Sequence, residues 1–215
     1  MKLDHIKLIV FDLDGTLIDS DKSIYKSTIR TLENFGIKFN IPEKEFSQMI
    51  GLHFQEIFHK FNIKVDDFEK FIEFYKSIYF SYINYSTVYP NVIEILKILK
   101  NKYFIALLTT KGQDQAEKIL QHFNLTQYFN YIWGRRDGVP VKPSPIPLLQ
   151  ICDEFKIQPE NTIIIGDAEI DVQCGKNAGA VTCAVTFGYR TKEKLLSENP
   201  DFIIDNLLEI DQLLK

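Results

Sequence analysis

Two aspartates separated by one residue follow an apolar run near the start of the chain. Asp12 and Asp14, in the segment Asp12-Leu13-Asp14-Gly15-Thr16, come directly after Leu8–Phe11. The apolar run is typical of a parallel strand that is buried on both faces. Alternation along such a strand would place both carboxylates on one side, where like charges oppose joint ionisation. A divalent cation or a protonated carboxyl relieves that repulsion, and both solutions suit phosphoryl transfer, whereas a solvated Asp-Gly turn is the alternative.

Polar residues also follow later apolar runs and precede one helix. They are Thr109 at the end of Phe104–Thr109 with Thr110 and Lys111 after it, Asp167 and Asp171 after Thr162–Gly166, and Lys142 in the loop Gly138–Pro143. The carboxyl ends of parallel strands lie at one edge of a sheet, so we expect these residues to converge with Asp12. Carboxylates, a hydroxyl and an ammonium together can bind a hard cation such as Mg²⁺ and a phosphoryl group.

Strands alternate with helices over most of the chain, which predicts an α/β fold with a Rossmann-like, doubly wound parallel sheet. A helical block from about Ser20 to Tyr85 interrupts this alternation after the first strand. Gly36, Pro42 and Gly51 punctuate the block, and it shows no strand pattern. We therefore predict a core domain of residues 1–18 and 87–215, and an inserted α-helical cap domain of residues 19–86.

Hydrophobic periodicity sets the expected elements. The expected helices are Lys22–Phe35, Pro42–Ile50, Phe54–Phe61, Val65–Tyr82, Asn91–Leu99, Gln113–Phe123, Ser144–Phe155 and Ile170–Asn177. The expected strands are Leu8–Phe11, Phe104–Thr109, Tyr131–Gly134, Thr162–Gly166, Val181–Thr186 and Phe202–Ile204. Aromatic residues at helical spacing predict the packing face of one cap helix, with a dimer contact as the alternative: Phe68, Phe71, Tyr75, Tyr79 and Tyr82.

Charge and composition narrow the class of partner. The net charge of −4 and the lack of a long basic run argue against nucleic acid. No apolar stretch approaches a membrane span and the start lacks a secretory signal pattern, so we expect a cytoplasmic protein without a membrane partner. Cys152, Cys174 and Cys183 have no metal-ligand spacing, and we expect them to be reduced thiols in the core.

Four motifs, taken in order, resemble those of the haloacid dehalogenase-like superfamily of phosphohydrolases. They are Asp12-Leu13-Asp14-Gly15-Thr16, the strand end at Thr109, Lys142, and the segment Gly166–Asp171. The resemblance covers essentially the whole chain, including a helical cap after the first motif. Ala168 departs from the pattern, since the family usually has Ser or Thr there, which removes a possible hydrogen bond but no charge.

The resemblance implies an Mg²⁺-dependent phosphatase that forms an aspartyl-phosphate. It implies that Asp12 is the nucleophile and that Asp14 is the general acid and base. Asp12, the backbone carbonyl of Asp14, and Asp167 would hold Mg²⁺. Asp171 would ligate the ion or orient one of its ligands.

The resemblance also implies how the phosphoryl group is bound and which bond is broken. Thr109 and Lys142 would bind the transferring phosphoryl group, together with backbone amides around Leu13 and Thr110. The dehalogenases of the superfamily lack an aspartate at the position of Asp14, so phosphate ester hydrolysis is expected rather than carbon–halogen cleavage.

Within the superfamily, the chain is most similar to the phosphoglycolate phosphatase-like group. That group also includes inorganic pyrophosphatases and sugar-phosphate phosphatases, so the expected substrate is a small phosphorylated metabolite. A related mutase would have a histidine ten residues after Asp14, where this chain has Ile24, which disfavours a mutase. A non-catalytic phosphometabolite-binding regulator is a further alternative, although all the expected charged residues are present. A monomer and a homodimer both fit the sequence.

Two further segments are candidates for substrate specificity. The turn Gly51-Leu52-His53-Phe54 is a candidate specificity loop that would point His53 into the site. A surface position for His53 at the start of a helix is the interpretation that the sequence slightly favours. Arg135 and Arg136 follow a strand end and either meet an anionic part of the substrate or lie in a solvated loop.

Overall fold

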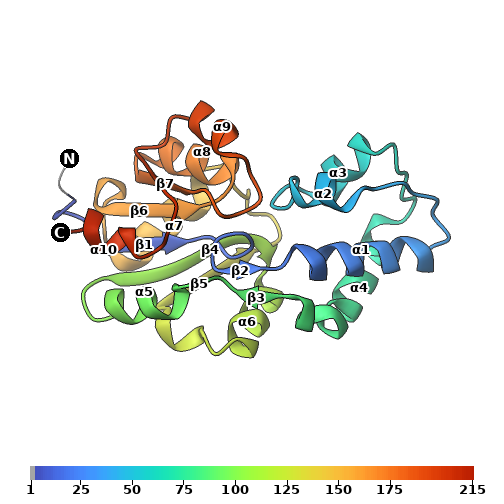
Figure 1. Ribbon diagram of the computed structural model, residues 1–215, viewed down its shortest axis with the longest axis horizontal. Coiled ribbons are helices and arrows are strands. Elements are labelled where there is room, and N and C mark those ends of the chain that lie inside the picture. The colour runs from blue at the N-terminus through green and yellow to red at the C-terminus, as the bar shows by residue number, and fades with distance from the viewer. Residues whose placement is uncertain (1–2) are drawn as a thin grey trace.

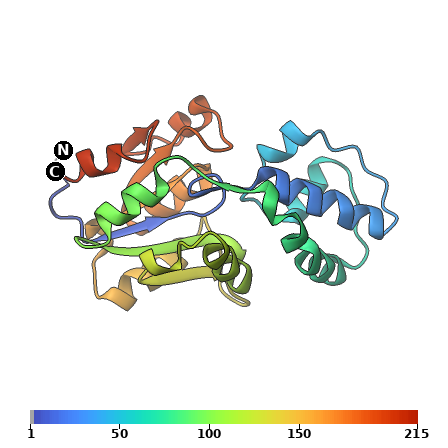
Figure 2. The ribbon, with the colours of Figure 1, turned by 60° about the horizontal axis from the view of Figure 1, so that its bottom comes forward.

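The computed structural model, which describes residues 3–215, shows two lobes joined by two chain crossings (Figure 1). Residues 1–2 of the first predicted domain lie outside the described residues. The core lobe (residues 3–19 and 87–215) is a sheet covered by helices, and the helical lobe (residues 20–86) consists of helices (Figure 2). Within residues 3–215, no helix has both the length and the apolar character that crossing a membrane requires.

Six parallel strands form the sheet of the core lobe, in the order β5-β4-β1-β6-β7-β8. They are β1 (Leu8–Phe11), β4 (Phe104–Gly112), β5 (Tyr131–Arg135), β6 (Thr162–Gly166), β7 (Val181–Val185) and β8 (Phe202–Ile204). Strand β1 pairs with β4 on one side and β6 on the other, so the residues that follow these three strands gather at one edge. The predicted α/β class, with a doubly wound parallel sheet and an inserted helical unit, is confirmed.

Helices cover both faces of this sheet (Figure 2). They are α5 (Val92–Leu99), α6 (Gln113–His122), α7 (Ile146–Phe155), α8 (Glu169–Ala178), α9 (Lys192–Ser197) and α10 (Glu209–Leu213), with 3-10 turns at Thr126–Tyr128 and Pro159–Asn161. Alternate residues of β1 pack in opposite directions: Ile9 and Phe11 join one buried cluster, and Leu8 and Val10 join another. This double burial explains why β1 has a continuous apolar sequence. The short helices α9 and α10 were not predicted.

The helical lobe packs around an aromatic core. Its helices are α1 (Asp21–Asn34), α2 (Glu43–Ser47), α3 (Phe54–Lys60) and α4 (Phe68–Tyr79), and a 3-10 helix, Phe80–Tyr85, follows α4. Phe71, Tyr75 and Tyr79 are buried on α4, and the ring centres of Phe58 and Phe71 lie 5.2 Å apart. The aromatic residues Phe68, Phe71, Tyr75 and Tyr79 therefore pack within the lobe, as predicted, whereas Tyr82 lies in the 3-10 helix beyond α4 and outside this cluster. Helix α4 is shorter than the predicted 65–82, because Asp67 caps its start and the 3-10 helix replaces its last turn.

Strands β2 (Ile18–Asp19) and β3 (Thr87–Val88) pair antiparallel where the chain enters and leaves the helical lobe. Neither was predicted, because two residues are too few to show alternation. The predicted domain boundaries, 18/19 and 86/87, fall at this pair. The division into a core domain and a cap domain at these positions stays a prediction.

Candidate functional site

Three buried aspartates lie together at the carboxyl edge of the sheet. Asp12 follows β1, Asp167 follows β6, and Asp171 lies in the first turn of α8. One carboxylate oxygen of each lies within 4.8 Å of the other two. The carboxylate of Asp171 also accepts a hydrogen bond from the backbone N–H of Ala168 at 3.0 Å, which orients it at the start of the helix. These oxygen ligands fit a hard divalent cation, so the three aspartates could hold Mg²⁺.

Burial and the neighbouring carboxylates favour the protonated forms of Asp12 and Asp167 when no cation neutralises them. The pKa of Asp167 is raised to about 7, first by burial and next by the charge of Asp171. Burial also raises the pKa of Asp12, against the lowering effect of Lys142 and with a further rise from Asp171. Ionised carboxylates in a site with so little water are unfavourable unless a cation binds them.

We expect the metal-free protein to become less stable as pH rises from about 5 to about 8. The pKa of the Asp167 carboxyl is about 7 in the folded state and ordinarily 3.8, so the folded state binds more protons over this interval. The free energy of unfolding then falls with pH, by roughly 2–4 kcal/mol from this group. Because Mg²⁺ binds ionised carboxylates, it should raise Tm most at pH 8.

Thermal unfolding at pH 5, 6.5 and 8, with EDTA or with Mg²⁺, checks this expectation. The Asp167→Asn variant lacks the titrating carboxyl, so its Tm should depend less on pH and should respond less to Mg²⁺. If the wild type and the variant show the same dependence of Tm on pH in EDTA, Asp167 is not the group whose ionisation destabilises the metal-free protein.

Lys142 neutralises part of this negative charge from the loop before α7. Its side chain is 1% exposed, and its Nζ donates to Asp12 at 2.7 Å and to Asp171 at 2.6 Å. A third hydrogen bond goes to the Leu108 carbonyl at 2.9 Å. Burial alone would lower the pKa of Lys142, but the two carboxylates raise it above its ordinary value. Lys142 is therefore a cation at neutral pH, held beside Asp12 as the sequence predicted.

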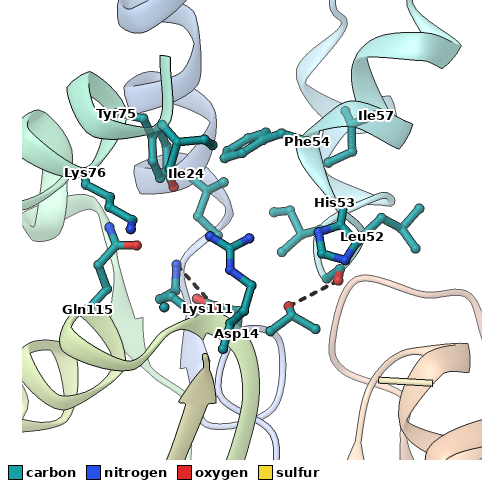
Figure 3. Close-up of a pocket in the computed structure, with 16 residues that line it drawn as sticks. Asp14, Ile24, Leu52, His53, Phe54, Ile57, Tyr75, Lys76, Lys111 and Gln115 are labelled. Carbon is teal, nitrogen blue, oxygen red and sulfur yellow. Dashed lines mark hydrogen bonds and ion pairs between the residues drawn. The ribbon is translucent and has the colours of Figure 1, made fainter. Parts of the chain in front are cut away.

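The side chain of Asp14 is not a member of this group of three carboxylates, and it faces Lys111 (Figure 3). Its Oδ2 is 3.3 Å from Nζ of Lys111, and its Oδ1 accepts a hydrogen bond from the hydroxyl of Ser20. Strand β1 ends at Phe11 and the backbone turns at Gly15, whose φ is +89°, so strand alternation does not extend to Asp14. The expectation that both carboxylates point to one side stays a prediction. A metal-binding role for the backbone carbonyl of Asp14 stays a prediction.

The two threonines at the end of the predicted second strand have different partners. Thr109 is buried, and its hydroxyl accepts a hydrogen bond from the backbone N–H of Lys111 at 3.2 Å. Thr110 donates its hydroxyl to the carbonyl of Gly51, in the helical lobe, at 3.2 Å. Strand β4 continues past Thr109 to Gly112, after an irregularity in its register with β5. Thr109 lines a small hollow together with Lys142, whereas the side chain of Thr110 joins the two lobes.

The sequence model of the haloacid dehalogenase-like hydrolase family matches this chain over residues 9–185. The chain belongs to this family. The phosphoglycolate phosphatase of Aquifex aeolicus is 33% identical, covering 97% of this chain and 97% of its own length. The pyrophosphatase PpaX of Bacillus mycoides is 30% identical, covering 95% of each chain. A haloacid dehalogenase-like protein from Streptococcus pneumoniae has a similar solved structure, with a TM-score of 0.89, 26% identity, and coverage of 98% and 99%. The predicted family and enzyme class are confirmed.

In this haloacid dehalogenase-like hydrolase, a cavity of about 90 Å³ lies between the lobes beside Asp14 (Figure 3). The core lobe lines it with Asp14, Thr110, Lys111, Gly112, Gln115 and Arg135. The helical lobe lines it with Ile24, Ile57, Ile72, Tyr75, Lys76 and residues 50–54, which we call the cavity turn. Three basic residues, Lys76, Lys111 and Arg135, line the cavity, and Asp14 is its one carboxylate. The cavity therefore suits an anionic ligand that also contacts an apolar wall.

Of the residues considered for substrate specificity, His53 and Arg135 line the cavity and Arg136 does not. His53 directly precedes α3 and lines the cavity, so both interpretations of its position describe part of what is seen (Figure 3). Arg135 lines the cavity, whereas the guanidinium of Arg136 stacks 3.8 Å from the ring centre of the buried Trp133. Lys111 was noted after the strand end at Thr109 but was given no role in the site, and here it pairs with Asp14 and lines the cavity.

Proposed function

We propose that this hydrolase is an Mg²⁺-dependent phosphatase that acts on a small phosphorylated metabolite through an aspartyl-phosphate, similar to phosphoglycolate phosphatase. The observation that carries the proposal is the separation of two aspartates at the same strand end. Asp12 lies among carboxylates that can hold a cation, 2.7 Å from the ammonium of Lys142. Asp14 lies outside that group, bonded to Ser20 and beside the cavity. This is the arrangement that a nucleophile and a separate acid and base need.

In the first step, a carboxylate oxygen of Asp12 attacks phosphorus and the bond from phosphorus to the leaving oxygen breaks. Asp14 gives its proton to that leaving oxygen. In the second step, Asp14 takes a proton from water, the water oxygen attacks phosphorus, and the phosphorus–Asp12 bond breaks. Inorganic phosphate leaves, and both aspartates return to their first states.

The remaining residues of the site stabilise charge on the phosphoryl group. Lys142 and Thr109, with the backbone amides near Leu13 and Thr110, would contact its oxygens as negative charge builds up. Mg²⁺ held by Asp12, Asp167 and Asp171 would supply further positive charge at the same oxygens. Without that charge, an anionic substrate would be repelled by three carboxylates.

The helical lobe, with the predicted boundaries 19–86, would act as a cap over the site. It contributes the apolar wall and Lys76 to the cavity beside Asp14. A cap in this position keeps bulk water from the aspartyl-phosphate during the first step and contacts the part of the substrate beyond the phosphate.

Two observations bear on the alternatives. Ile24 lines the cavity at the position where a related mutase would have a histidine, and an isoleucine cannot carry a proton, so hydrolysis is favoured over isomerisation. The pyrophosphatase of Bacillus mycoides shares 30% identity with this chain, which makes pyrophosphate the second candidate substrate.

Phosphate release from a panel of substrates tests the proposal. The panel is phosphoglycolate, pyrophosphate, sugar phosphates, nucleoside monophosphates and p-nitrophenyl phosphate, each with Mg²⁺ and with EDTA. We expect at least one substrate to be hydrolysed about 100-fold faster with Mg²⁺ than with EDTA. Equal rates in both, on every substrate, would favour the non-catalytic regulator.

A further inference from the structure

Arg190 links the core lobe to the helical lobe behind the site. Its side chain is 4% exposed, its Nε donates to Glu169 at 2.6 Å, and its Nη2 donates to the backbone carbonyl of Ile50 at 2.9 Å. A guanidinium is costly to remove from water unless its donors find partners in good geometry. Nε and Nη2 have such partners, whereas Nη1 has none among the described residues. The partner of Nη2 is a carbonyl of the cavity turn, so part of this buried charge is used to hold the turn.

The next carbonyl of the cavity turn is held as well. The hydroxyl of Thr110 donates to Gly51 at 3.2 Å. Gly51 has a φ of +101°, and a Cβ built there would lie 3.5 Å from Ile170 and 4.0 Å from Nη2 of Arg190. Two successive carbonyls are therefore bonded to two side chains of the core lobe, and the turn packs directly on that lobe.

The same part of the core lobe also holds the aspartates. The backbone N–H of Tyr189 donates to Asp167 at 2.8 Å, and the hydroxyl of Tyr189 accepts from the backbone N–H of Ser20 at 2.8 Å. Glu169, the partner of Arg190, lies between Asp167 and Asp171 in the sequence. The position of the cavity turn is thus fixed relative to the aspartates through a short, continuous set of contacts.

We propose that Arg190 is a positioning residue that determines specificity for compact phosphate esters, an inference that rests on the proposed function. Arg190 lies behind the cavity turn and is not among the described residues that line the cavity, so it acts through the turn. The turn forms part of the wall of a cavity of about 90 Å³ beside Asp14, so the position of the turn sets the room for the part of the ester beyond the phosphate. A turn held against the core lobe keeps this room small, which favours a compact group over an aryl group.

Kinetics with a compact and an aryl substrate test this role. The variants are Arg190→Met, Arg190→Lys and Thr110→Val, and the matched control is Arg30→Met, which alters an exposed arginine of α1. The substrates are phosphoglycolate and p-nitrophenyl phosphate, each with Mg²⁺. For Arg190→Met we expect KM for phosphoglycolate to rise about tenfold, while kcat/KM for p-nitrophenyl phosphate stays within twofold or rises.

Arg190→Lys should restore part of the preference for phosphoglycolate over p-nitrophenyl phosphate, because lysine keeps the positive charge but lacks the several N–H donors of a guanidinium. Thr110→Val should reduce this preference as Arg190→Met does, but by a smaller factor. Arg30→Met should leave the preference unchanged. An equal loss on both substrates in a folded Arg190→Met variant would overturn the inference, because general damage to the fold does not distinguish substrates.

Hydrogen exchange supplies a second measurement that needs no activity. In Arg190→Met, the amides of residues 48–57 should exchange about tenfold faster than in the wild type, with no such change in Arg30→Met. Unchanged exchange in this segment would also overturn the inference. If the wild-type protein hydrolyses no substrate of the panel with Mg²⁺, the proposed function fails, and hydrogen exchange still decides whether Arg190 holds the turn.

Discussion

Asp12→Asn is expected to lower kcat by about 10⁴–10⁶-fold, because the amide cannot attack phosphorus. The change is nearly isosteric and removes one of three mutually repelling carboxylates. Lys142 keeps its hydrogen bonds to Asp171 and to the carbonyl of Leu108. We therefore expect Tm in EDTA to be equal to or above that of the wild type, so that lost activity is not lost folding.

Phosphate release with Mg²⁺ and thermal unfolding measure the two effects. Asp14→Asn is the matched control, because it removes the same charge from the residue proposed as acid and base. With a substrate whose leaving group needs no proton, Asp14→Asn should still become phosphorylated, and mass spectrometry should detect the added phosphoryl group. Asp12→Asn should never acquire it. Phosphorylation of Asp12→Asn, or activity within 100-fold of the wild type, would exclude Asp12 as the nucleophile.

Lys142→Met is expected to reduce kcat/KM by about 10²–10³-fold, because one preorganised donor to the phosphoryl oxygens is lost. The change also removes the cation between Asp12 and Asp171, and breaking a buried ion pair costs roughly 3–5 kcal/mol of stability. Because the pKa of Asp12 is raised, that carboxyl can take up a proton when Lys142 is absent. In EDTA, the loss of stability should therefore be smaller than that of a typical broken buried ion pair. Added Mg²⁺ should recover part of the stability, but it should not recover the activity.

Lys156→Met is the matched control for this variant. Lys156 also pairs with an aspartate, Asp153, at 2.9 Å, but its side chain is 79% exposed, and such pairs contribute roughly 0–1 kcal/mol. Steady-state kinetics and chemical denaturation, with and without Mg²⁺, compare the two. A Lys142→Met variant that keeps more than a tenth of the wild-type kcat/KM would argue against a direct role in phosphoryl transfer.

The sequence predicted the part of the site that depends on strand order. Buried parallel strands appear as apolar runs, and their carboxyl ends meet at one edge, so the convergence of Asp12, Asp167 and Lys142 follows from patterns along the chain. The same reasoning predicted the sheet and its helices, because their hydrophobic periods extend over several turns or several strand residues.

Features that depend on single distant contacts were beyond sequence reasoning. The environment of Asp14 is built by a glycine turn together with Ser20 and Lys111, and Tyr189, which binds Ser20, lies 169 positions further along the chain. Arg190 is an isolated arginine in an irregular segment, and no pattern of spacing connects it to Ile50. Such contacts are set by how the two lobes pack.

The antiparallel pair of β2 and β3 also bears on how proteins of this architecture diversify. Asp19 and Thr87 are cross-strand partners, so the helical lobe begins and ends at neighbouring positions, like an elaboration at the tip of a hairpin. Lengthening such an insertion adds only a logarithmic entropy of closure. Helices can therefore be added, lost or exchanged there without displacing the strand that carries Asp12. The cap side of the cavity and the carboxylates at the end of the sheet are therefore encoded in separable stretches of sequence, and core-lobe contacts such as that of Arg190 with Ile50 link the two.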